Sequence, residues 1–241
     1  MTANVIQGQP GFILRQKKYR ETSLIIDVLT RDFGRISLLA RGVRIGKSKT
    51  AAALQPFIPL TLSYRGDGEL KILTDVNGAQ FPLELKGLAL YCGFYINELI
   101  IYFLHQYDPH PELFLDYNSC LDQLTGATGQ QIQIALRLFE LSLIEKIGYG
   151  LQLEYDFQSG LPLDPEKNYA FDVEQGAYED SNGYLKGITL QALSVKSLPN
   201  QQILAEAKHL MRDVIDFYLQ GRPLKSRQVI NQIIKRTTHE Q

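Results

Sequence analysis

The chain has 241 residues, of which 44% are apolar and 21% are charged, and its formal net charge at pH 7 is -1. This is an ordinary globular composition with enough apolar residues for a core in one large or two modest domains. Two cysteines, Cys92 and Cys120, are too few for a disulfide framework or a four-ligand zinc site, and such single thiols suit a reducing compartment.

Residues 10–75 are predicted to form five β-strands. Runs rich in Ile, Leu, Val, Tyr and Thr recur between turn signals, at residues 11–20, 23–31, 34–42, 57–65 and 69–76. Gly34 is available for a positive φ in the second connection, and Asp67-Gly68 is a favoured hairpin pair in the last. Five short strands favour a small barrel of the oligonucleotide-binding (OB) type, and an SH3-like barrel is the main rival.

The third connection, residues 39–57, is long and basic. Arg41, Arg44, Lys47 and Lys49 lie within nine positions, and the segment contains no acid. Its GVRIGKS stretch resembles a phosphate-binding loop, but three residues separate the first glycine from Gly-Lys-Ser where that motif needs four. The spacing therefore excludes an ATPase loop and leaves a cationic loop.

After Pro82 the apolar period changes from two to about 3.6, which predicts helices. The predicted segments are residues 86–105, 111–124, 130–148, 189–197, 200–220 and 224–237. The first contains the longest apolar run, but Asn97 and Glu98 lie past its middle, so we expect a buried soluble helix and no membrane span. Glycines, prolines and an Asn182-Gly183 hairpin turn at about 151–186 predict a β-containing insertion.

The predicted fold class is therefore α+β. An N-terminal five-stranded OB-fold barrel, residues 1–80, is followed by a mostly helical domain, residues 81–241, with the small β-containing insertion. The N-terminal residues show no basic region followed by an apolar run, so we expect no signal peptide and a cytoplasmic protein.

The motifs of enzymes and metal sites are not found in the sequence. The four histidines form no His-x-x-x-His pair, there is no Cys-x-x-Cys, and the paired carboxylates lie in turn-rich segments. We expect no catalytic residue, no metal and no cofactor.

The charge is strongly segregated along the chain. Residues 1–80 hold 12 Lys and Arg against 6 Asp and Glu, residues 81–216 hold 8 against 19, and residues 217–241 hold 5 against 1. A basic face attracts polyanions, although a solvated surface is the simpler explanation of any charge run. In an OB barrel, bases can also stack on aromatic rings, and we expect one or two of five aromatics to be exposed for this purpose: Phe12, Tyr19, Phe33, Phe57 and Tyr64.

Five stretches, in the same order and spread over the chain, resemble the bacterial RecO recombination mediator family. They are RETSLIIDVLTRDFGRISLLARGVR, ALQPFIPLTL, LYCGFYINELI, LRLFELSLIEKIGYG and GRPLKSR. The resemblance implies a non-enzymatic protein of DNA repair and recombination that binds single- and double-stranded DNA and anneals complementary strands. It also implies action with RecR to load RecA onto DNA coated by single-stranded DNA-binding protein, whose acidic C-terminal tail binds the helical domain. Such a protein is expected at the nucleoid.

The resemblance and the charge pattern together give candidate site residues. The DNA-binding set is Lys17, Lys18, Arg20, Arg35, Arg41, Arg44, Lys47 and Lys49, and a possible second patch is Lys225 and Arg227. The resemblance assigns the acidic-tail contact to Arg137, which we expect at the surface; an intrahelical pair with Glu140 is the alternative. Some family members carry a four-cysteine zinc module in the insertion, but residues 151–186 contain no cysteine, so we expect packing alone to hold it together.

Two other functions remain open from the sequence. An RNA-binding factor could use the same barrel, and a preference for structured RNA over single-stranded DNA would indicate it. A protein adaptor without nucleic-acid binding would use the helical domain instead.

Overall fold

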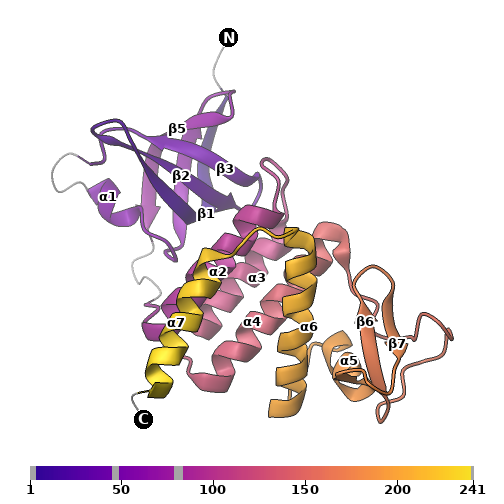
Figure 1. The fold of residues 1–241 in the computed structure, drawn as a ribbon. Coiled ribbons are helices and arrows are strands. Elements are labelled where there is room, and N and C mark those ends of the chain that lie inside the picture. The colour runs from indigo at the N-terminus through magenta and orange to yellow at the C-terminus, as the bar shows by residue number, and fades with distance from the viewer. Residues whose placement is uncertain (1–3, 45–48, 79–83, 240–241) are drawn as a thin grey trace. The chain divides into compact units, whose positions relative to one another are not determined.

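The structure is a computed structural model that describes residues 4–44, 49–78 and 84–239, without the side chains of Lys49 and residues 234–239 (Figure 1). The chain divides into two compact units. We call residues 1–126 and 226–241 the barrel unit and residues 127–225 the helical unit. The first two long helices belong to the barrel unit, so the compact units separate after residue 126, whereas the predicted limit at residue 80 marks the change from strands to helices. Residue 80 as a domain boundary stays a prediction.

The barrel unit contains the predicted five-stranded OB-like barrel. Its strands are β1 (Val5–Tyr19), β2 (Ser23–Thr30), β3 (Gly34–Ala40), β4 (Leu60–Arg65) and β5 (Leu70–Gly78). They close in the order β1-β2-β3-β5-β4, and every pair is antiparallel except β3 with β5. Asp67-Gly68 lies in the connection between β4 and β5, as predicted.

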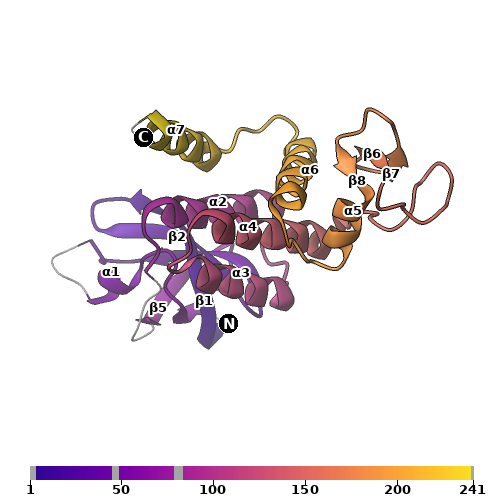
Figure 2. The same cartoon turned by 90° about the horizontal axis from the view of Figure 1, so that it is seen from below.

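A short helix, α1 (Lys49–Ala53), interrupts the third connection, which was predicted to be loop throughout. Its Ala51-Ala52-Ala53 run has the highest intrinsic helix propensity. The helix lies against β5 (Figure 2), and Leu54, which follows it, is buried in the barrel core. The backbone carbonyl of Leu54 accepts a hydrogen bond from the Gln16 side chain of β1. Tertiary packing therefore fixes part of this connection.

The barrel core follows the period-two pattern of the strands. Buried and half-exposed residues alternate along β3, so that Ile36 and Leu38 point into the core with Ile26 of β2. Gly34, at the start of β3, has φ 65, and its Cα lies so close to Asp108 that an added Cβ would be 2.1 Å from the Asp108 carbonyl oxygen. The positive φ predicted for Gly34 is confirmed.

Helices α2 (Gly87–Phe103) and α3 (Pro111–Leu124) cover the outer side of β1. The ring of Phe12 lies 5.1 Å from that of Tyr117 in a T-shaped arrangement. The Tyr117 hydroxyl donates to Asn97 Oδ1 at 2.6 Å, and Asn97 Nδ2 donates to the Leu14 carbonyl at 3.0 Å. Burial raises the pKa of Tyr117 well above its usual value. Asn97 was a reason to expect no membrane span in this segment. Its side chain hydrogen-bonds α2 to α3 and to β1 of the barrel.

The C-terminal helix α7 (Lys225–His239) extends from Ser226 onward within the barrel unit and runs beside α2 (Figure 1). Glu98 of α2 accepts hydrogen bonds from the backbone nitrogen of Ser226, at 2.9 Å, and from its hydroxyl, at 2.5 Å. A carboxylate at a helix N-terminus satisfies free N–H groups and favours the helix dipole. Glu98 therefore fixes the start of α7.

The helical unit contains α4 (Gly129–Ile144), the π-helical turn η1 (Glu145–Tyr149), α5 (Gly187–Ser194) and α6 (Gln201–Leu219). Its small sheet consists of β6 (Asn168–Asp172), β7 (Gly176–Glu179) and β8 (Leu185–Lys186) in the order β7-β6-β8. The predicted insertion is therefore present. However, β7 and β8 both pair with β6, so the turn at Asn182-Gly183 is not the predicted hairpin between paired strands.

A buried carboxylate organises the insertion, which corrects the expectation that packing alone holds it. Asp156 Oδ1 accepts from the backbone nitrogens of Gln158, at 2.9 Å, and Ser159, at 2.7 Å, and Oδ2 accepts from that of Glu179 at 2.6 Å. Burial acts to raise the pKa of Asp156, but these hydrogen bonds to the carboxylate together outweigh it and lower the pKa. The charged form of Asp156 thus joins a tight turn to β7.

Candidate nucleic-acid interface

Five of the predicted DNA-binding cations are exposed on the barrel unit, along the last residues of β1 and in the loops beside them. We call this set the cationic rim: Lys17, Lys18, Arg20, Arg41 and Arg44. In the β ladder, Lys18 lies opposite Leu24, and Leu24 lies opposite Ala40. Arg41, which follows Ala40, therefore lies at the same end of the three strands as Lys18. Strand pairing therefore gathers cations that are more than 20 positions apart in the sequence.

Hydrogen bonds tie the two loops of the rim together. Arg44 donates through its backbone nitrogen to the Thr22 carbonyl at 2.9 Å and through Nη1 to the Arg20 carbonyl at 3.1 Å. Arg20 takes a left-handed conformation with φ 53, which turns the chain between β1 and β2. One acid, Glu21, follows Arg20 in the turn between β1 and β2 and is exposed. The result is a local excess of positive charge in a fixed backbone arrangement.

Arg35 does not belong to the rim. It lies at the opposite end of β3 from Arg41, is half-buried, and donates through Nε to the Leu104 carbonyl at 3.1 Å. Burial lowers the pKa of its guanidinium. Arg35 therefore connects β3 to the end of α2, and its role in DNA binding stays a prediction.

Two further cations of the predicted set are only partly covered by the structure. Lys47 lies outside the described residues, and Lys49 begins α1 without a described side chain. Their role in DNA binding stays a prediction.

Of the five candidate aromatics, three are buried: Phe12, Phe57 and Tyr64. Phe33 is 37% exposed but lies in the turn between β2 and β3, at the other end of these strands from the rim. Tyr19 is half-buried at the end of β1, with the Arg20 guanidinium carbon 5.3 Å from its ring centre. Tyr19 is therefore the aromatic that the fold places with the rim.

The possible second patch is partly engaged within the protein. The Arg227 guanidinium carbon lies 5.7 Å from the ring centre of Tyr95, and Nη2 donates to the Tyr95 hydroxyl at 3.4 Å. Lys225 is exposed at the first residue of α7. Arg227 thus has a structural contact with α2 that the sequence did not predict.

Arg137 is not at the surface, contrary to expectation. It is 8% exposed, and its Nη2 contacts the fully buried Glu140 Oε1 one turn along α4. Its Nη1 donates to the Lys208 carbonyl of α6 at 3.4 Å. The alternative role, an i,i+3 pair with Glu140, is confirmed.

A cavity of about 270 Å³ in the helical unit was missed by the sequence reasoning. Four leucines line it, together with Lys196 and two acids, Glu145 and Glu154; the leucines are Leu141, Leu151, Leu153 and Leu193. The Lys196 Nζ lies 2.7 Å from Glu145 Oε2, and both side chains are about half exposed. An exposed pair of this kind contributes little stability, so an incoming carboxylate can replace Glu145 at small cost. The lining residues come from two parts of the chain, residues 141–154 and 193–196, so no single local pattern marks the cavity.

Two general results concern the described part of the chain. Among residues 4–44, 49–78 and 84–239, no group of three or more His, Cys, Asp or Glu side chains is placed to hold a metal ion. No helix in those ranges is long and apolar enough to cross a membrane. The expectation of a chain without metal or cofactor stays a prediction.

Comparison with known proteins identifies the family. The model of the recombination protein O N-terminal domain matches residues 5–81, and that of the recombination protein O C-terminal domain matches residues 85–228. The chain is 43% identical over 221 residues to the DNA repair protein RecO of Methylococcus capsulatus, covering 91% of this chain and 90% of the relative. It is 39% identical over 233 residues to the proteins of the same name from Shigella boydii serotype 18 and Escherichia coli O139:H28, covering 95% of this chain and 96% of each relative. The chain therefore belongs to the RecO family of DNA repair proteins.

Proposed function

We propose that this protein is a non-enzymatic recombination mediator that binds single- and double-stranded DNA through the cationic rim and anneals complementary strands. The supporting observation is the gathering of Arg20, Arg41 and Arg44 by strand pairing and loop hydrogen bonds on an OB-like barrel. Backbone phosphates are the natural ligand of such a surface, because their neutralisation releases counterions. Bringing two strands to one cationic surface also lowers their mutual repulsion, which favours annealing.

We infer the protein partners from what the resemblance to the RecO family implies. We infer that the chain acts with RecR to load RecA onto DNA coated by single-stranded DNA-binding protein. Because Arg137 is buried against Glu140, we place the acidic tail of the coating protein at the leucine-lined cavity beside Lys196 instead. That cavity offers the half-exposed Lys196 ammonium group for a carboxylate and leucine side chains for a neighbouring apolar group, and Glu145 and Glu154 also line it.

DNA binding is tested by the salt dependence of affinity. The rim variant Arg20→Gln/Arg41→Gln/Arg44→Gln keeps much of each side-chain stem and removes three charges. With a fluorescent oligo(dT) strand titrated across a potassium chloride series, its slope of log affinity against log salt should flatten by up to about 2, at about 0.7 per phosphate contact. Annealing of complementary strands should slow in parallel.

A matched control is Arg31→Gln, an exposed arginine in the turn between β2 and β3 that pairs with Asp32 at 2.8 Å. It should leave the slope unchanged. If the folded rim variant keeps the parent slope, or Arg31→Gln flattens it as much as one rim cation, the rim is not the DNA contact. Competition by structured RNA that exceeds competition by single-stranded DNA would favour the RNA-binding alternative.

A further inference from the structure

Three aromatic rings of the helical unit form an exposed cluster that the DNA-binding proposal does not use. We call Tyr149, Phe217 and Tyr218 the three-ring cluster. Tyr149 stacks on Tyr218, with ring centres 4.1 Å apart and planes inclined by 19°. Phe217 meets Tyr218 at 87°, with centres 5.2 Å apart. Tyr149 is 46% exposed and Phe217 is 47% exposed, so the cluster presents large aromatic surfaces to solvent.

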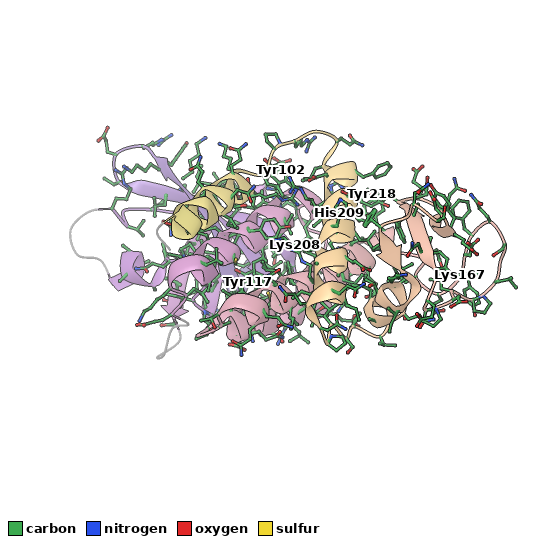
Figure 3. All side chains as sticks on the ribbon, turned by 60° about the horizontal axis from the view of Figure 1, so that its bottom comes forward. Tyr102, Tyr117, Lys167, Lys208, His209 and Tyr218 are labelled. Carbon is green, nitrogen blue, oxygen red and sulfur yellow. The ribbon has the colours of Figure 1, made fainter. Side chains whose placement is uncertain are left out.

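The cluster is built on rigid elements. Tyr149 ends η1, directly after Gly148, whose φ of 92 breaks the helical path. Phe217 and Tyr218 lie in the last turn of α6, which ends at Gln220 in the left-handed conformation with φ 51. Figure 3 labels Tyr218 on this helix. Exposed rings on helix ends, held against one another, lose little conformational freedom when a ligand binds. This is the property expected of a docking surface.

Two helix ends and one carboxylate at the cluster favour a cation, while Lys146 in the last turn of η1 and Arg222 after α6 act against this. Two helical segments, α4 with η1 and α6, both end here, and the carbonyl end of a helix carries partial negative charge. Burial raises the pKa of the Tyr218 hydroxyl, and the charges of Tyr149 and of Glu174, in the turn between β6 and β7, add to this rise. No ion pair involves Glu174 within the described residues. Aromatic faces are themselves electron-rich and attract cations.

We propose that the three-ring cluster and Glu174 dock an extended segment of a partner protein through an arginine side chain. The guanidinium would lie on the exposed ring surface and pair with the Glu174 carboxylate, because arginine both stacks on aromatic planes and bonds carboxylates. A nucleic-acid strand fits less well, since its phosphates would face Glu174 and two helix C-termini. The insertion, residues 151–186, adds to this repulsion, with eight Asp and Glu against two Lys.

The test uses the full chain and two fluorescent twelve-residue peptides of Gly, Ser and three arginines, identical except that citrulline replaces arginine in the second. Binding is followed by anisotropy, and the Tyr149 and Tyr218 ring signals by NMR. The arginine peptide should shift both signals and bind more tightly than the citrulline peptide by at least two- to fivefold, the ratio for one exposed cation–π contact. Phe217→Leu and Glu174→Gln should each weaken it by roughly two- to fivefold.

Glu166→Gln is the matched control, because Glu166 is an exposed acid of the same insertion outside the cluster; it should bind the arginine peptide like the parent. Circular dichroism checks that each variant is folded. Equal binding of the two peptides would overturn the cationic specificity, and unchanged ring signals would overturn the docking surface. Arg222 lies four residues after Tyr218, so oligo(dT) is tested as well. If oligo(dT) shifts the ring signals and the arginine peptide does not, the cluster is a base-stacking platform.

Discussion

Replacing Arg137 with alanine should destabilise the helical unit, not merely remove a surface charge. The substitution takes the guanidinium away from Glu140, which is fully buried, and from the Lys208 carbonyl. Breaking a buried ion pair by removing one partner costs about 3–5 kcal/mol. At about 2–4 °C per kcal/mol for a chain of this size, the melting temperature should fall by about 6–20 °C.

Calorimetry of a variant without either charge tests the origin of this loss. Arg137 Nε is buried without a hydrogen-bond partner in the described part of the chain, so the pair is imperfectly satisfied. Replacing both charges by apolar groups, in Arg137→Met/Glu140→Met, should therefore recover much of the stability that Arg137→Ala loses. If Arg137→Ala melts within about 1 °C of the parent protein, well inside the range expected for a surface substitution, the argument from burial is refuted.

The same variants separate structure from tail binding. Lys196→Gln should weaken an acidic tail peptide while leaving the melting temperature nearly unchanged, because its pair with Glu145 is exposed. Arg137→Met/Glu140→Met should bind the peptide like the parent. If the folded double variant loses peptide binding and Lys196→Gln binds normally, Arg137 and not Lys196 contacts the tail.

Two more predictions concern the stability of each unit. The pKa of Asp156 is lowered from 3.8 in the folded state, so the stability that its charge contributes is present above the unfolded pKa and is lost as pH falls through the folded pKa. In urea titrations, the difference in unfolding free energy between the parent and Asp156→Asn should therefore close below about pH 4. A difference that does not change with pH would contradict this. Gly34→Ala should lower the unfolding free energy by more than about 1 kcal/mol in chemical denaturation, because it combines a positive φ with a Cβ 2.1 Å from the Asp108 carbonyl oxygen. Gly68→Ala is the control and should not have this effect, because the space around Gly68 is open. Equal losses in the two variants would contradict the steric explanation.

The sequence predicts the elements well where their burial is periodic. Alternation along β3 and the 3.6-residue spacing of the buried side chains of α6 arise from local geometry, so each is readable from its own segment. Helix α1 was missed because its alanines carry no apolar stripe and sit beside a basic, glycine-containing loop. Its packing on β5 is a tertiary contact that no window of sequence contains.

The roles of individual cations were less predictable than their positions. Arg35 and Arg41 are six residues apart with the same chemistry, yet Arg35 bonds a carbonyl 69 positions away, whereas Arg41 is exposed on the rim. Arg137 likewise owes its contact with α6 to Lys208, 71 positions along the chain. Charge runs therefore locate a candidate surface, but pairing across the fold decides which members are available to a ligand.

The two units carry net charges of opposite sign, and this bears on the proposal that the chain engages DNA and proteins at once. The helical unit has 13 Asp and Glu against 9 Lys and Arg, whereas the barrel unit has 13 against 16, with 3 against 10 in its residues 15–49. A strand bound at the rim therefore gains nothing by spreading onto the helical unit, where its phosphates meet net negative charge. Conversely, a cationic segment is drawn to the three-ring cluster and repelled by the rim. Segregated charge thus lets one chain hold a polyanion and a basic partner segment without competition between them, and raising the salt should weaken the first contact more steeply than the second, because only the first releases condensed counterions.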